Sequence, residues 1–68
     1  MKINVIDNGT PNDDSEWYLN PATVCVAQRD RYYDGNPRYF LHTTDSGVWE
    51  VTLESYCDVV SWMEIHNG

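Results

Sequence analysis

The stretch Arg38–Leu53, which reads RYFLHTTDSGVWEVTL, contains the plainest structural pattern in the chain. Apolar and polar residues alternate on both sides of a short polar turn, and alternation with a period of two is typical of β-strands. The turn, Asp45-Ser46-Gly47, has the length of a hairpin loop, and we expect Gly47 to adopt positive φ there. The stretch therefore predicts two antiparallel strands, over 38–44 and 48–53, with core-facing residues Trp49, Val51 and Leu53.

Residues 23–33 lie before a second turn, Asp34-Gly35-Asn36-Pro37, and predict a third strand that pairs with the first of these two. In regular alternation Val24 and Val26 point to one side of this strand, and Cys25 points to the other. Because both sides are fairly apolar, we interpret the run as a central strand of the sheet.

Short apolar runs separated by turn-forming residues make up the first third of the chain. Met1–Ile6 is rich in β-branched residues and predicts a short strand. Glu16–Leu19 is a second short apolar run, and Asn20-Pro21 ends it with a corner because proline removes a backbone donor. Between these runs, residues 7–16 predict an exposed acidic loop with a tight turn at Asn8-Gly9.

After Leu53 the apolar period changes to that of a helix. Ser55 followed by Asp58 resembles a capping box, which predicts a helix over 56–66. Residues on one face of this helix are Tyr56, Val59, Val60 and Met63. A fifth strand over Val59–Ile65 is the competing interpretation, and ten residues of periodicity leave both open. The fold class predicted is α+β: an antiparallel β-meander of four to five strands with one short C-terminal helix packed on one face.

Length and charge limit the classes of function. A chain of 68 residues predicts a single small β-rich domain. Eleven acidic residues against four Lys and Arg give a net charge of -7, which argues against direct binding of nucleic acid or of an anionic membrane. We find no signal peptide or membrane-spanning run, and we expect a cytoplasmic protein.

No motif points to a reaction, and we expect no enzyme activity, cofactor or metal. The possible zinc ligands lack the close spacing of a zinc site, and they are Cys25, His42, Cys57 and His66. We interpret the two cysteines as buried thiols, and whether they pair is left open. Asp45 and Ser46 beside His42 match the residue types of a hydrolase triad, but turns favour Asp and Ser for conformational reasons.

The acids themselves are the candidate functional feature. A negative patch could occupy the Lys/Arg groove of a nucleic-acid-binding protein, and complementary charge would speed the encounter. The predicted acidic patch consists of Asp13, Asp14, Glu16, Glu50, Glu54 and Asp58. Aromatic anchors are predicted at Tyr32, Tyr33 and Trp62, because such residues are enriched at binding hot spots.

Two resemblances accompany this interpretation. The corner Trp17-Tyr18-Leu19-Asn20-Pro21, with Glu54-Ser55 and Val59-Val60 in the helix, resembles the FlbD-type small flagellar-operon proteins over Glu16–Met63. In style, a short, acidic, aromatic-rich chain is similar to small phage inhibitors such as anti-CRISPR proteins. We therefore expect a non-enzymatic phage-type inhibitor that binds a basic protein surface. The alternative is a structural or regulatory β-module of the FlbD kind, pairing as a homodimer through a strand edge.

Overall fold

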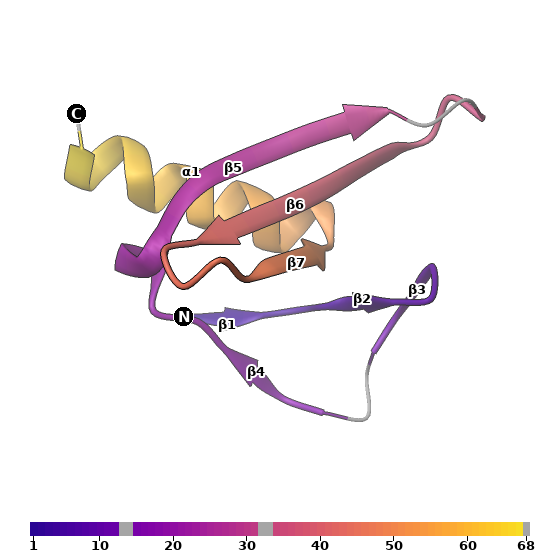
Figure 1. Cartoon of the computed structure of the whole chain (residues 1–68), viewed down its shortest axis with the longest axis horizontal. Helices are drawn as coiled ribbons and strands as arrows, with labels where there is room; N and C mark the ends of the chain where they lie inside the picture. The colour runs from indigo at the N-terminus through magenta and orange to yellow at the C-terminus, as the bar shows by residue number, and fades with distance from the viewer. Residues whose placement is uncertain (13–14, 32–33, 68) are drawn as a thin grey trace.

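A three-stranded antiparallel sheet forms the centre of the structure, a computed structural model that describes residues 1–12, 15–31 and 34–67. Its strands are β5 (Val24–Arg31), β6 (Pro37–Thr43) and β7 (Val48–Val51), in the order β5-β6-β7. The helix α1 (Leu53–Asn67) follows β7 directly and packs against β6 and β5 (Figure 1). The prediction of an α+β fold with antiparallel strands and one C-terminal helix is confirmed.

Two small ribbons complete the β-structure. β1 (Lys2–Ile3) pairs with β4 (Trp17–Tyr18), and β2 (Ile6–Asp7) pairs with β3 (Thr10–Pro11), both antiparallel. The β2–β3 turn is Asn8-Gly9, as predicted, and both residues have positive φ, at 52° and 84°. A short 3-10 helix, η1 (Pro21–Thr23), follows Asn20, whose side chain accepts the Ala22 N–H at 3.1 Å.

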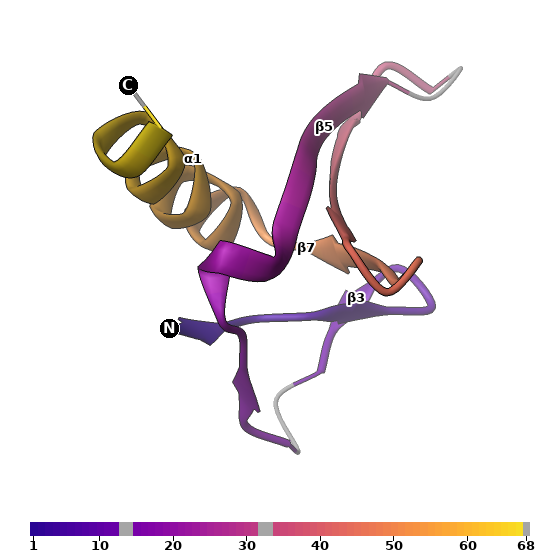
Figure 2. The ribbon, with the colours of Figure 1, turned by 60° about the vertical axis from the view of Figure 1, so that its left-hand side comes forward.

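The hydrophobic core lies between one face of the sheet, α1 and the N-terminal segment. Figure 2 shows α1 on one side of the β5–β6 hairpin. An isolated bridge between Val5 and Val51 fastens the N-terminal segment to the free side of β7. The buried apolar residues are Ile3, Val5, Val24, Leu41, Val51 and Val59.

The helix begins earlier than predicted, because Thr52 and not Ser55 caps it. Thr52 Oγ1 accepts the Ser55 N–H at 3.3 Å. Ser55 is buried, and its hydroxyl accepts the backbone N–H of Asn4 at 2.7 Å, while Thr52 N–H donates to the Asn4 carbonyl at 3.1 Å. Leu53 was expected to face the core, but as the first helical residue it is exposed.

Strand β5 departs from the predicted alternation. The register of its pairing with β6 shifts between Val24 and Val26, as in a β-bulge. Val24 therefore points into the core, whereas Val26 lies on the opposite face and is 49% exposed. The strand is also an edge of the sheet and not its centre, as Figure 1 shows. A one-residue shift exchanges the two faces of a strand, which alternation alone cannot reveal.

Both cysteines are exposed and neither forms a disulfide, which corrects the prediction of buried thiols. Cys25 lies in the irregular part of β5, where its Sγ–H donates to the carbonyl of His42 at 3.3 Å. Cys57 lies on the side of α1 opposite Val59, the buried residue that faces the sheet.

The β6–β7 turn also differs in detail from the expectation. The left-handed residue is Ser46, with φ of 70°, and not Gly47. Gly47 is needed for another reason: a Cβ there would lie 2.6 Å from Thr43 Oγ1. Close approach of side chains, and not backbone freedom, makes glycine necessary at this position.

Candidate functional site

An acidic row on α1 contains three of the predicted site residues. Glu54, Asp58 and Trp62 are four residues apart, so they lie on one side of the helix over successive turns. Both carboxylates are exposed, and the half-buried ring of Trp62 stacks on His66 with centroids 4.2 Å apart. Glu54 stands in the first helical turn, where the helix dipole favours a negative charge.

Glu50, predicted to belong to the same patch, is engaged elsewhere. It forms a two-point ion pair with Arg38, in which Arg38 Nε donates to Oε2 at 2.7 Å and Nη2 donates to Oε1. Its side chain is only 16% exposed. Its charge is therefore compensated within the protein, and we leave it out of the acidic row.

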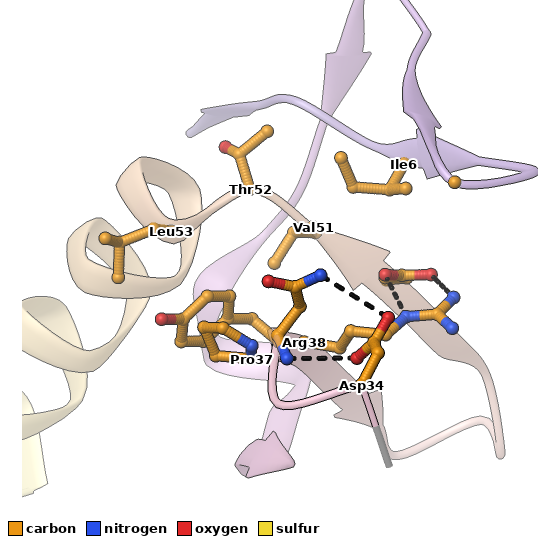
Figure 3. A pocket seen from close by; sticks show the side chains of 11 residues that line it. Ile6, Asp34, Pro37, Arg38, Val51, Thr52 and Leu53 are labelled. Carbon is orange, nitrogen blue, oxygen red and sulfur yellow. Dashed lines mark hydrogen bonds and ion pairs between the residues drawn. The ribbon is translucent and has the colours of Figure 1, made fainter. Parts of the chain in front are cut away.

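The ion pair lines a hollow of about 520 Å³ between the β2–β3 hairpin, β6 and the junction of β7 with α1. Figure 3 shows Ile6 on one wall, with Val51, Thr52 and Leu53 on another. Asp34 lies at the same hollow and accepts the Asn36 backbone N–H at 3.0 Å. The charged groups drawn there bond to neighbours within the hollow, and the arrangement suits a structural role.

Glu16 lies apart from α1, on the segment that leads into β4. It is exposed, 3.9 Å from the ammonium of Lys2, and it accepts a long hydrogen bond of 3.5 Å from the Tyr18 hydroxyl. Exposed pairs of this kind contribute little to stability. The remaining predicted residues lie outside the described residues, and they are Asp13, Asp14, Tyr32 and Tyr33.

A second concave surface was not predicted from the sequence. The rings of Trp17 and Trp49 meet with centroids 5.6 Å apart and planes tilted by 55°. They line a pocket of about 310 Å³ together with Tyr18 and Asp45. Trp17 comes from β4 and Trp49 from β7, and no local pattern reveals a contact between segments so far apart in the chain. In the sequence, the one sign of this pocket is a large aromatic residue, Trp17, close to the corner at Asn20-Pro21.

Asp45 carries a full negative charge at this pocket. Its Oδ1 accepts bonds from the Thr43 hydroxyl and, at 3.2 Å, from the Gly47 N–H. The bond from Thr43 first, and then that from Gly47, hold the pKa of Asp45 below its ordinary value of 3.8. The carboxylate is therefore ionised at neutral pH.

No protein-family model matches this chain, and no curated protein or solved structure is significantly similar to it. Within residues 1–12, 15–31 and 34–67, no helix is long and apolar enough to cross a lipid bilayer.

Proposed function

We propose that the chain is a non-enzymatic acidic binding protein whose helix α1 docks on the basic surface of a nucleic-acid-binding protein. The observation that carries this proposal is the row formed by Glu54, Asp58 and Trp62 on one side of α1. When α1 occupies this basic surface, the nucleic acid would be unable to bind to it, and the chain would act as a phage-type inhibitor.

Charge composition supports this role for the helix. Residues 39–68 contain no Lys or Arg, so no basic side chain of α1 neutralises Glu54 or Asp58. Four helical residues rise roughly 6 Å along the axis, which places two carboxylates one turn apart on a rigid element. A basic groove would attract such a row over long range, and the attraction would weaken as salt is added.

Trp62 would supply the apolar part of the contact. Its ring is half-buried and held by the stack with His66, so little side-chain freedom would be lost on binding. Tryptophan is among the residues most enriched at binding hot spots. The proposed contact is thus a short charged row that ends in one aromatic anchor.

The test is displacement of fluorescein-labelled DNA or RNA from a panel of purified basic nucleic-acid-binding proteins. We expect the chain to displace the nucleic acid from at least one of them at low salt and to lose this ability at high salt. The double variant Glu54→Gln/Asp58→Asn should weaken displacement at least about tenfold, because two interfacial charges are removed. Asp7→Asn/Glu64→Gln is the matched control, since it removes the same charge from exposed positions outside the row.

Equal weakening by both double variants would show that only net charge matters, and the docking of α1 would be rejected. Displacement that is unaffected by salt would reject the electrostatic mechanism. Failure to displace nucleic acid from every member of the panel would reject the inhibitor role.

A second candidate, homodimerisation of a FlbD-type module, is favoured by the edge of β5. This strand spans eight residues and pairs with β6 on one side only, as far as the described residues go. An unpaired strand edge can pair with a second copy of the chain. Sedimentation at increasing concentration would support this candidate if the mass rises to that of a dimer, and a constant monomer mass would exclude it.

A further inference from the structure

The pocket beside Trp17 and Trp49 combines aromatic walls with one carboxylate. Trp17, Tyr18 and Trp49 supply rings, and Tyr18 is 71% exposed, at the rim. The Nε1 atom of Trp17 is buried and has no hydrogen-bond partner among the described residues. Indole and phenol rings attract cations through the negative charge on their faces.

Asp45 lies next to Trp49 because both pack against the Gly47 turn. A Cβ at Gly47 would be 3.1 Å from Asp45 Oδ1 and 3.1 Å from Trp49 Nε1, so these two atoms are separated by no more than twice that distance. The lining of the pocket therefore places an aromatic side chain and the carboxylate of Asp45 beside each other.

We propose that this pocket binds the primary ammonium group of a lysine side chain from a partner protein, with Asp45 as its counter-ion. The site shares no residue with the acidic row on α1, so it goes beyond the function proposed above and is tested separately.

The carboxylate selects the kind of cation. Asp45 Oδ1 already accepts two hydrogen bonds, from Thr43 and Gly47, and Oδ2 is not the acceptor in either of them. Arginine binds carboxylates best through both oxygens, and Oδ1 already has two donors here. A quaternary ammonium has no N–H to donate to Oδ2. A lysine ammonium has three donors on a point charge and needs only one acceptor.

The test uses the ¹⁵N-labelled protein and capped lysine, Nα-acetyl-lysine methylamide, as the probe. The indole N–H signals of Trp17 and Trp49 report on the pocket, and that of Trp62, which does not line it, serves as an internal reference. We expect capped lysine to shift the first two signals saturably. The Nε-acetylated form of the probe, which lacks the charge, should leave them unchanged.

Two variants and one control variant assign the contact to named groups. Asp45→Asn keeps an acceptor for the hydrogen bonds from Thr43 and Gly47. Because it removes the charge, it should weaken the binding of capped lysine about tenfold. Asp30→Asn removes the same charge from β5, outside the pocket, and should change nothing. Tyr18→Leu, at an exposed position, removes a ring face without a charge and should weaken binding about fivefold.

Four outcomes would overturn the proposal. Equal shifts with the acetylated probe would make the pocket a purely apolar site. Binding of tetramethylammonium without binding of capped lysine would exclude lysine as the ligand. No shift with capped lysine, or equal weakening by Asp45→Asn and Asp30→Asn, would exclude a specific ammonium site, while the test of Glu54 and Asp58 would stand unaffected.

Discussion

Arg38 and Glu50 lie diagonally across β6 and β7 and form a two-point ion pair next to the ring of Phe40. The register places Glu50 opposite Phe40, two residues from Arg38, and diagonal neighbours on one face are within reach of long side chains. The Arg38 guanidinium carbon is 5.9 Å from the centre of the Phe40 ring. This arrangement fastens β7 to β6 on the face of the sheet that α1 does not cover.

Removing the charge of Glu50 should destabilise the fold. Glu50→Gln leaves Arg38 without its carboxylate, and we expect a loss of about 1–2 kcal/mol, because a part-buried, charge-assisted pair is lost. Urea unfolding of the variant measures the loss. Glu16→Gln, which removes the exposed partner of Lys2, is the control and should cost under about 0.5 kcal/mol. Equal costs for the two variants would contradict the structural role of the pair.

The lowered pKa of Asp45 predicts a dependence of stability on pH. A carboxylate whose pKa is lower in the folded state stabilises the fold fully above its unfolded pKa, near 3.8. This contribution is lost as the pH falls through the folded-state pKa. The Asp45→Asn variant should therefore lose less stability than the parent as the pH falls below about 3.8. Thr43→Val removes the hydrogen bond that is the main cause of the lowered pKa, so it should raise the pKa of Asp45 in a carboxyl NMR titration.

The two turn residues Ser46 and Gly47 should respond in opposite directions to substitution. Gly47→Ala brings a Cβ within 2.6 Å of Thr43 Oγ1, and we expect it to cost at least about 1 kcal/mol. Ser46→Gly relieves the positive φ of Ser46 and should stabilise the protein by about 0.5 kcal/mol. Thermal unfolding of both variants checks this, and a stabilising Gly47→Ala would show that the turn is wider than described.

Both thiols should react in the folded protein. Cys25 and Cys57 are exposed and free, so a disulfide-exchange reagent should modify two thiols per chain without denaturant. The readout is absorbance of the released thiolate, with the unfolded protein as the reference for complete reaction. Modification of fewer than two thiols before denaturation would restore the interpretation of Cys25 or Cys57 as a core residue.

Local patterns predicted the elements of this fold better than their faces. The hairpin over 38–53 and the C-terminal helix follow from periodicity, and both are present. The bulge between Val24 and Val26 could not be foreseen, because it depends on how β5 pairs with β6. The helix start was misplaced because Thr52 and Ser55 both suit a cap, and the burial of Ser55 decides between them.

The candidate site depends still more on tertiary contacts. Glu54 and Asp58 are four residues apart, and this spacing alone predicts that they lie on one side of the predicted helix. Alternation likewise put Glu50 on the outer face, but its pairing with Arg38 depends on strand register. The pocket at Trp17 and Trp49 joins distant segments, and only the folded chain brings them together.

The bond between the Asn4 N–H and the Ser55 hydroxyl has a consequence for the order of folding. It joins residues 51 positions apart, whereas β5, β6, β7 and α1 each contact a neighbour that is close in the chain. Contacts between distant positions close large loops and form late. We therefore expect the segment before β5 to join the structure last. In native-state hydrogen exchange it should be the first part to exchange, as one cooperative unit.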